Sequence, residues 1–149
     1  SYKLKGGVIM DMGPYIAAVS RLIFKSKPKK MTKNITLSNK ITKKLKIFFT
    51  YENSFFSGEF SHDDNYKNLL EIYLKDRVIK LSRVFSPPPK ENLQTIEIKE
   101  NITKTKKFSD DVFINYIKEV FKQIKKKKYS YYEKRMIYDM KIREFLQKN

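Results

Sequence analysis

Residues 6–15 read GGVIMDMGPY, and the fold of the first part of the chain depends on how this stretch is read. A pair of glycines opens an apolar run, Asp11 interrupts that run, and Gly13-Pro14 follows it. Burying an aspartate among such residues costs several kcal/mol unless the carboxylate is paired. The stretch therefore predicts either a helix start that Asp11 caps or a helix on which Asp11 has a partner.

Tyr15 is the nearest candidate partner. On a helix, Asp11 and Tyr15 are at positions i and i+4 and lie on one face. A carboxylate beside a phenol can polarise it, or hold it to donate a proton to a reacting oxygen. In the alternative, Asp11 caps a helix that begins near Met12, with Pro14 in its first turn. The spacing by itself favours the cap.

Residues 15–24 carry helical periodicity, with Ile16, Val19 and Ile23 on one side and Ala18 and Leu22 beside them.

Strand signals dominate the chain from there to residue 99. Hairpins are expected around Asn53 and around Lys75-Asp76, and the prolines of 86–89 must stop strand pairing. The expected strands are residues 33–39, 46–52, 54–60, 68–74, 77–85 and 93–99.

Two helices are expected after the strands. Ser109 can cap the first, with Asp110 and Asp111 in its first turn. Ser130 and Glu133 form a capping-box pattern at the start of the second. The apolar stripe of the first helix would be Phe113, Tyr116, Ile117, Val120, Phe121 and Ile124, and the inward face of the second Met136, Ile137, Met140, Ile142 and Leu146.

This order of elements predicts an α+β fold with a mostly antiparallel or mixed open sheet and helices packed on one face. In residues 46–52, Ile47, Phe49 and Tyr51 alternate with Phe48, so the strand is apolar on both sides. One helical layer covers one face of a sheet. We therefore expect the other face to be available for a homodimer partner or another domain.

Composition is consistent with a single domain over residues 1–149. Lys and Arg number 33 against 16 Asp and Glu, a formal charge of +17. A basic excess can bind nucleic acid, but only five of the basic residues are Arg. A composition rich in Lys, Ile, Asn, Tyr and Phe, such as an AT-rich coding sequence gives, explains the excess more simply, so nucleic-acid binding is not the expected function. No apolar run is long enough to span a membrane and there is no Cys, which predicts a soluble cytoplasmic protein.

Common catalytic motifs are missing. His62 is the only histidine. With Asp63 and Asp64 it could bind a metal, but a histidine in a polar loop is more often a surface residue, so no metal is expected. There is no G-x-G-x-x-G and no P-loop to hold a dinucleotide or triphosphate. The remaining candidate for chemistry is the Asp11–Tyr15 pair.

Two segments of the chain contain three sequence elements that resemble those of a known family and follow the same order. Residues 6–24, GGVIMDMGPYIAAVSRLIF, resemble the glycine-pair, D-x-G-x-[YH] helix of the Gfo/Idh/MocA oxidoreductases. Residues 57–89, SGEFSHDDNYKNLLEIYLKDRVIKLSRVFSPPP, resemble the strand pair of that family, Y-x-N-x-(L/I)-E-I-Y-G-x-x-G-x-I, followed by R-x-F-(T/S)-P-P. This last element, R-x-F-(T/S)-P-P, is similar to the one found in the branch of the family that includes nucleotide-sugar 3-ketoreductases and relatives of glucose–fructose oxidoreductase.

The resemblance implies a C-terminal domain that binds substrate and forms dimers, beside a Rossmann domain that binds NAD or NADP. If the roles of the family's motif residues apply here, Asp11 would orient the active site and Tyr15 would be the acid/base partner on the sugar oxygen. Gly6 and Gly7 would allow close approach of the substrate or of a neighbouring domain. Tyr66 and Asn68 match Y-x-N and would stabilise the start of their strand.

The sequence also departs from the family. These residues contain no dinucleotide fingerprint and no E-K-P lysine, and Leu74 and Asp76 stand where the family often has glycine. We therefore expect no cofactor on this chain alone and a need for a Rossmann domain in cis or in trans. The expected function is the substrate half of an NAD(P)-dependent nucleotide-sugar oxidoreductase. A non-catalytic dimerisation or scaffold module of the same fold is the alternative.

Overall fold

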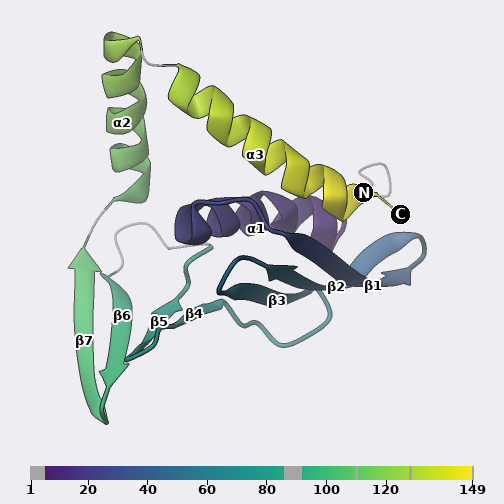
Figure 1. Ribbon diagram of the computed structural model, residues 1–149, viewed down its shortest axis with the longest axis horizontal. Coiled ribbons are helices and arrows are strands. Elements are labelled where there is room, and N and C mark those ends of the chain that lie inside the picture. Colours follow the sequence, from purple (N-terminus) through teal and green to yellow (C-terminus); the bar gives the residue numbers. More distant parts are fainter. Residues whose placement is uncertain (1–5, 86–91, 110, 128, 149) are drawn as a thin grey trace. The chain divides into compact units, whose positions relative to one another are not determined.

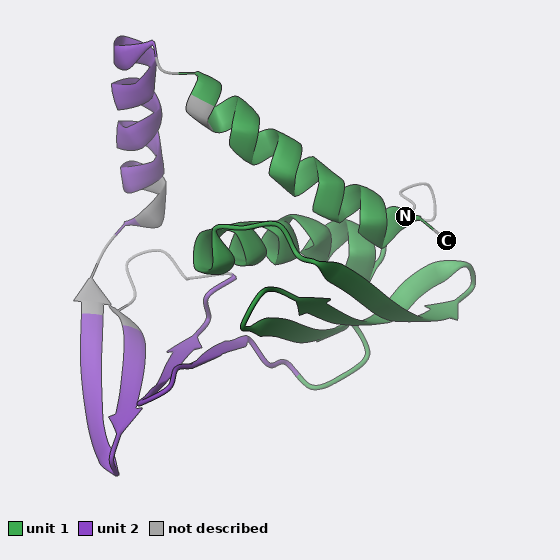
Figure 2. Ribbon diagram, in the orientation of Figure 1, with its two compact units in different colours: residues 1–65, 129–149 green, residues 66–128 purple. Residues whose placement is uncertain are grey.

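The computed structural model describes residues 6–85, 92–109, 111–127 and 129–148 (Figure 1). Strands β1–β3 form one antiparallel sheet and β4–β7 a second one, which confirms an α+β fold with open antiparallel sheets. The chain divides into two compact units, residues 1–65 with 129–149, and residues 66–128 (Figure 2). The elements are α1 Val8–Phe24, β1 Lys30–Ser38, β2 Ile41–Thr50, β3 Phe55–Ser61, β4 Leu69–Tyr73, β5 Val78–Ser82, β6 Asn92–Lys99, β7 Ile102–Ser109, α2 Val112–Lys126 and α3 Ser130–Gln147.

The first unit has one apolar core between its sheet and its two helices. Strand β2 supplies Leu45, Ile47 and Phe49 to the core from alternate positions, while Phe48 between them is 44% exposed. This is the alternation expected of a strand with one covered face. The fully or nearly buried apolar side chains are Val8, Ile16, Ala17, Val19, Leu45, Ile47, Phe49, Tyr51, Ile142 and Leu146.

Turn residues set the register of this sheet. Asn39 and Lys40 both have positive φ, 51° and 62°, and form the two-residue connection between β1 and β2. The expected strand at 33–39 is therefore longer and belongs to a hairpin. The second hairpin turns around Asn53, as predicted, and pairs Thr50 with Phe55.

Helix α1 begins earlier than the capping interpretation of Asp11 allows. Gly7 is its N-cap, and the Asp11 N–H donates to the Gly7 carbonyl at 3.1 Å. Pro14 lies inside the helix rather than in its first turn, and because it has no N–H it cannot donate to the Met10 carbonyl. On the buried side, Ala17 and Ser20 replace the predicted flank of Ala18 and Leu22, and Leu22 is 58% exposed.

Helix α3 packs through a different face from the one predicted. Ile142 and Leu146 are buried as expected, but Met136, Ile137 and Met140 are more than half exposed. The capping box is also wrong, because Tyr129 is the N-cap without a side-chain bond, and Ser130 is already helical. The end of α3 is tied to β1, where Lys33 Nζ donates to the carbonyls of Phe145 and Leu146 at 2.9 and 2.8 Å.

Polar contacts select the packing face of α3. The Ser20 hydroxyl of α1 lies 2.5 Å from the Tyr51 hydroxyl, which follows β2, and 2.6 Å from the Tyr138 hydroxyl of α3. At the next residue of each helix, Arg21 Nε and Nη2 donate to the two carboxylate oxygens of Asp139 at 2.8 and 3.1 Å. These bonds join α1 and α3 through polar side chains, which a prediction based only on apolar residues does not include.

The second unit is a meander of four strands followed by α2. The β4–β5 hairpin turns at Lys75-Asp76 as predicted, with the Leu74 N–H donating to the Arg77 carbonyl at 2.8 Å. Strand β7 was not predicted. It follows a two-residue turn, Glu100-Asn101, in which both residues have positive φ. The prolines expected to stop pairing, residues 87–89, lie outside the described part of the chain.

The start of α2 differs from the predicted one. Ser109 is the last residue of β7 rather than a helix cap. Asp111 takes the capping role, because its Oδ1 accepts a hydrogen bond from the Ile114 N–H at 3.0 Å. The predicted apolar stripe exists on the helix but is exposed, by 52–68% at Tyr116, Ile117, Phe121 and Ile124 and by 37% at Val120. Phe113 lies in α2, but its side chain is outside the described set.

Candidate functional site

The glycine pair of the opening sequence lies where α1 meets the start of β2. Gly7 has a φ of 138°, which side chains of L residues rarely tolerate. A Cβ at Gly7 would lie 3.0 Å from both Ile41 Cγ2 and the Thr42 carbonyl oxygen. The close approach that this glycine permits in the described structure is thus to the chain's own backbone.

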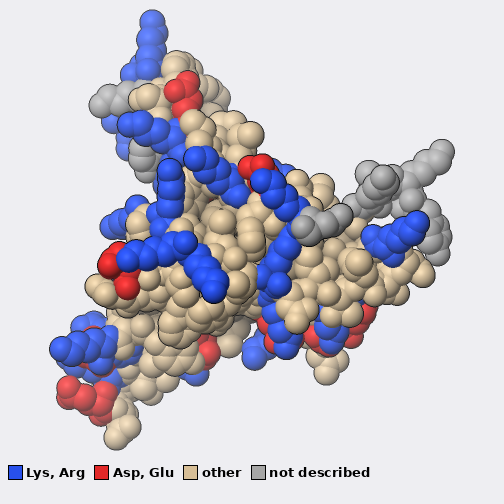
Figure 3. Space-filling model, turned by 45° about the vertical axis from the view of Figure 1, so that its right-hand side comes forward, with Lys and Arg blue, Asp and Glu red and all other residues tan. Residues whose placement is uncertain are grey.

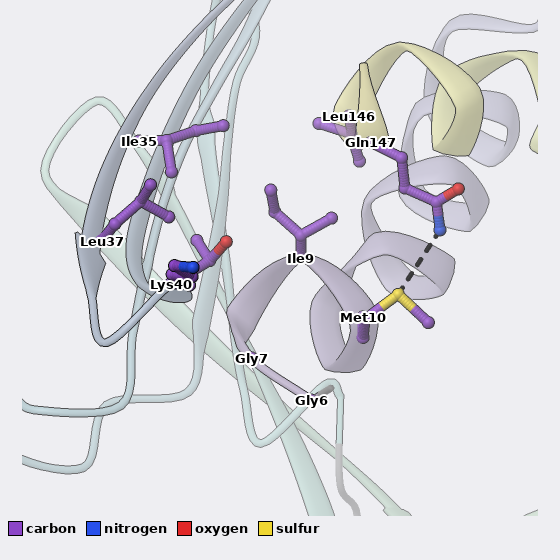
Figure 4. A pocket seen from close by; sticks show the side chains of 10 residues that line it. Gly6, Gly7, Ile9, Met10, Ile35, Leu37, Lys40, Leu146 and Gln147 are labelled. Carbon is purple, nitrogen blue, oxygen red and sulfur yellow. Dashed lines mark hydrogen bonds between the residues drawn. The ribbon is translucent and has the colours of Figure 1, made fainter. Parts of the chain in front are cut away.

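A pocket of about 310 Å³ opens beside the glycine pair (Figure 4). Its walls come from the start of α1, the β1–β2 hairpin and the end of α3, and they offer both polar and apolar surface. Lys40 and Gln147 are its long polar side chains, and Gln147 Nε2 lies 3.4 Å from Met10 Sδ. The lining residues are Gly6, Gly7, Ile9, Met10, Ile35, Leu37, Lys40, Thr42, Leu146 and Gln147.

Asp11 and Tyr15 lie on α1 beyond this pocket and are not among its lining residues. Both belong to the helix, one turn apart, so the expected i and i+4 placement holds. The Asp11 side chain is 59% exposed and Tyr15 is 41% exposed. Both side chains are therefore accessible to a ligand, and the helix beneath them is held by the buried Ile16 and Ala17.

The sequence considers His62 only as a metal ligand or a surface residue, and its contact with Asp11 was not predicted. Its Nε2 lies 3.2 Å from Asp11 Oδ2. Its neighbours in the sequence have other partners, since Asp63 Oδ1 lies 3.5 Å from Lys43 Nζ and Asp64 Oδ1 lies 2.8 Å from Lys44 Nζ. In residues 6–85, 92–109, 111–127 and 129–148, no group of three or more His, Asp or Glu side chains could hold a metal ion.

The other motif residues have structural contacts. The Asn68 carbonyl accepts the Arg83 N–H at 2.8 Å, and Asn68 Oδ1 accepts the Phe85 N–H at 3.3 Å. Asn68 Nδ2 donates to the Tyr66 hydroxyl at 3.4 Å. Asn68 thus joins the start of β4 to the segment that follows β5, which is the strand-stabilising role expected of it.

Lysines and arginines are spread over the surface rather than collected at this site. Figure 3 shows them scattered over the visible face with uncharged surface between them. Several have carboxylate partners, among them Lys46 with Glu59 at 3.2 Å and Lys80 with Glu71 at 2.8 Å. Arg77 lies between Asp76 and Glu97, and its guanidinium lowers the pKa of Asp76 to about 2. None of the described helices is long and apolar enough to cross a membrane.

Comparison with known proteins adds the fold relationship. No protein-family model and no curated protein sequence matches the chain. Among solved structures, the 3-ketoreductase KijD10 of Actinomadura kijaniata, with TDP-benzene and NADP, superposes with a TM-score of 0.71 at 15% identity over 83% of this chain. The yvaA protein of Bacillus subtilis, assigned as an oxidoreductase, gives a TM-score of 0.60 at 14% identity, also over 83% of this chain.

The chain has the fold of the C-terminal part of these oxidoreductases. At this level of identity the superpositions show a shared fold, which is the fold that the motifs of residues 6–24 and 57–89 imply. The chain spans 40% of the length of KijD10 and 44% of that of yvaA. A second KijD10 structure with NADP and TDP-benzene gives a TM-score of 0.63 over 70% of this chain and 33% of that protein.

Proposed function

We propose that this chain is the substrate-binding and oligomerisation part of an NAD(P)-dependent sugar oxidoreductase, and that its substrate is a nucleotide-linked keto sugar. The observation that carries the proposal is the superposition on KijD10 over 83% of the chain. It is supported by the D-x-G-x-Y element, which lies on α1 with both functional side chains exposed. The formal charge of +17 favours an anionic substrate such as a sugar diphosphate.

The proposed chemistry divides between this chain and a partner domain. A Rossmann domain would hold the nicotinamide, whose chemistry would be the supply of hydride for the carbonyl carbon of the sugar. Tyr15 donates its phenolic proton to the carbonyl oxygen, and the product is the alcohol. A phenol can donate its proton to a carbonyl oxygen that becomes an alcohol. Because Tyr15 is 41% exposed, its proton can be replaced from solvent after each turnover.

Asp11 has the orienting role in this proposal. Its carboxylate lies one turn before Tyr15 and can accept a hydrogen bond from a sugar hydroxyl next to the ketone. Such a bond fixes the carbonyl relative to the phenol, and correct placement of reacting groups accounts for a large part of catalysis. Gly6 and Gly7 line the neighbouring pocket, where a substrate can meet backbone without a side chain between them.

The test uses the chain joined to, or mixed with, a dinucleotide-binding domain, assayed with NADPH and a TDP-linked 3-keto sugar. The expected result is reduction by the unmodified chain and a loss of kcat of about a hundredfold in Tyr15→Phe. Asp11→Ala should also lower the rate. Tyr73→Phe is the matched control, because Tyr73 is 71% exposed and donates to Glu71 in the second unit.

Unchanged rates in both Tyr15→Phe and Asp11→Ala would contradict the assigned roles. Absence of reduction despite bound NADPH would instead favour the non-catalytic dimerisation or scaffold module. Light scattering addresses the oligomer separately, since the proposal expects a homodimer through an open sheet face. A monomer at high concentration would contradict that part.

A further inference from the structure

His62 is held in place by the sheet of the first unit. Its N–H donates to the Lys43 carbonyl at 3.2 Å, which continues the β2–β3 ladder by one residue beyond Ser61. Since β2 supplies Leu45 and Ile47 to the core, the backbone of His62 is attached to a rigid strand pair. The acidic neighbours of His62, Asp63 and Asp64, pair with Lys43 and Lys44. The carboxylate that the His62 ring contacts therefore comes from another element.

The ring meets α1 at Asp11. His62 Nε2 lies 3.2 Å from Asp11 Oδ2, with the two side chains 41% and 59% exposed. A carboxylate only accepts hydrogen bonds, so the contact is favourable when Nε2 carries a hydrogen. Sheet and helix belong to the same unit and share the core around Ile16 and Phe49. The two backbones that carry this contact therefore have a fixed separation.

We propose that His62 is a positioning residue for Asp11. The imidazole holds Oδ2 and limits rotation of the carboxylate, which leaves Oδ1 as the oxygen available to a sugar hydroxyl. This inference rests on the proposed function, because it assigns to Asp11 the orienting role described above. The metal-ligand interpretation of His62 is not needed, since its ring faces Asp11 on α1.

The contact itself is tested in this chain without a cofactor. His62 is the only histidine, so the proton resonances of its ring are isolated in the NMR spectrum. Asp11→Asn should shift those resonances, because the anionic acceptor is replaced by an amide. Asp64→Asn, which changes a carboxylate held 2.8 Å from Lys44 Nζ, is the matched control and should leave them nearly unchanged. Equal responses to both variants would overturn the inference.

The positioning role is tested by kinetics in the joined two-domain enzyme. His62→Phe keeps a ring but removes the donor, and it should lower kcat about tenfold with little change in KM, since misplaced groups lose rate more than binding. His62→Gln keeps an N–H donor and should restore most of the rate. Thermal unfolding should be the same in all three proteins.

The outcomes separate the two claims. An active enzyme whose rate does not change in His62→Phe would overturn the positioning role and leave the proposed function standing. An enzyme that fails to reduce any keto sugar while it binds NADPH would overturn the proposed function and the role of His62 with it. Loss of kcat in His62→Phe without recovery in His62→Gln would overturn hydrogen bonding as the cause.

Discussion

Gly7 and Gly13 stand six residues apart in the same helical segment, and their surroundings give them different roles. At Gly7 the backbone has a positive φ, and a Cβ would meet the backbone of Thr42 at 3.0 and 3.1 Å. At Gly13 a Cβ would only touch Leu146 Cδ1 at 3.8 Å and Arg143 Cγ at 4.0 Å, which is ordinary contact. The sequence of residues 6–15, with its glycine pair and its D-x-G-x-Y element, does not by itself separate these two environments.

We expect Gly7→Ala to lower the free energy of unfolding by about 1–3 kcal/mol, because it forces an unfavourable φ and a backbone clash. Gly13→Ala is the matched control and should be neutral or stabilising by up to about 1 kcal/mol, since alanine favours a helix interior. Urea denaturation followed by circular dichroism measures both. A Gly7→Ala protein as stable as the unmodified chain would contradict the strained-cap geometry.

Asp11 illustrates what single residues reveal in the sequence. The spacing to Tyr15 was readable and correct, because helix periodicity alone fixes it. The capping interpretation was wrong because the real cap, Gly7, has no side-chain signature and works through its backbone carbonyl. The partner of Asp11 was not readable either. His62 lies 51 positions away and reaches α1 only after β2 and β3 have paired.

At the scale of elements, three hydroxyls join α1, α3 and the end of β2. Ser20 is fully buried and bonds to Tyr51 and Tyr138, and Tyr138 also donates to the Ser26 carbonyl at 3.1 Å. Burial raises the pKa of Tyr51 above its usual range. Its phenol is therefore held in the neutral form that the apolar core requires.

This raised pKa predicts a pH dependence of stability. Since the unfolded chain has a tyrosine pKa of about 10, the contribution of Tyr51 is complete below that pH. It is lost as the pH rises from there towards the higher folded-state pKa. Tyr51→Phe should cost about 1 kcal/mol at neutral pH, the net worth of one hydrogen bond.

The difference in stability between Tyr51→Phe and the unmodified chain should shrink as the pH rises above about 10. Chemical denaturation at a series of pH values measures this difference, in which the titration of the many lysines cancels. Tyr73→Phe is the control, since Tyr73 is exposed and should show no comparable loss. A pH-independent difference for Tyr51→Phe would contradict the coupling between burial and ionisation.

Elements were predicted well where their signals are local. The hairpins at Asn53 and Lys75-Asp76 follow from strand runs next to turn residues. Strand β7 was missed because its lysines obscure the alternation of residues 102–109, although the turn residue Asn101 before it was a readable signal. The face of α3 was misjudged because Tyr138 and Asp139 bond to Ser20 and Arg21. Those partners are more than 100 positions away, where sequence periodicity carries no information.

At the scale of the whole molecule, the fold class was readable from the order of elements, and the family motifs gave the architecture. The division of the strands into a three-stranded and a four-stranded sheet could not be predicted from the sequence. Hairpin pairing is encoded between neighbours in the sequence, whereas the point at which a meander ends depends on contacts between distant strands. The net charge did not locate the site, because lysines occur on the strands and helices of both units.

The exposed stripe of α2 leads to a prediction about the distribution of stability in the chain. The apolar core of the first unit covers α1 and β2, whereas Ile117, Phe121 and Ile124 of α2 are more than half exposed. A 15-residue helix with an exposed apolar face is marginal in water. Amides of α1 and β2 should therefore exchange hydrogen slowly, and those of α2 quickly, in exchange measured by mass spectrometry.

A matched pair of isoleucines tests the same point thermodynamically. Ile142 of α3 is 2% exposed and Ile117 of α2 is 52% exposed. Ile142→Ala should lower the free energy of unfolding by about 2–5 kcal/mol, because it leaves a cavity. Ile117→Ala should change it by no more than about 0.5 kcal/mol. Equal losses, with α2 amides as protected as those of α1, would mean that the stripe is covered in solution. Protection that rises with protein concentration would then identify a second copy as the cover.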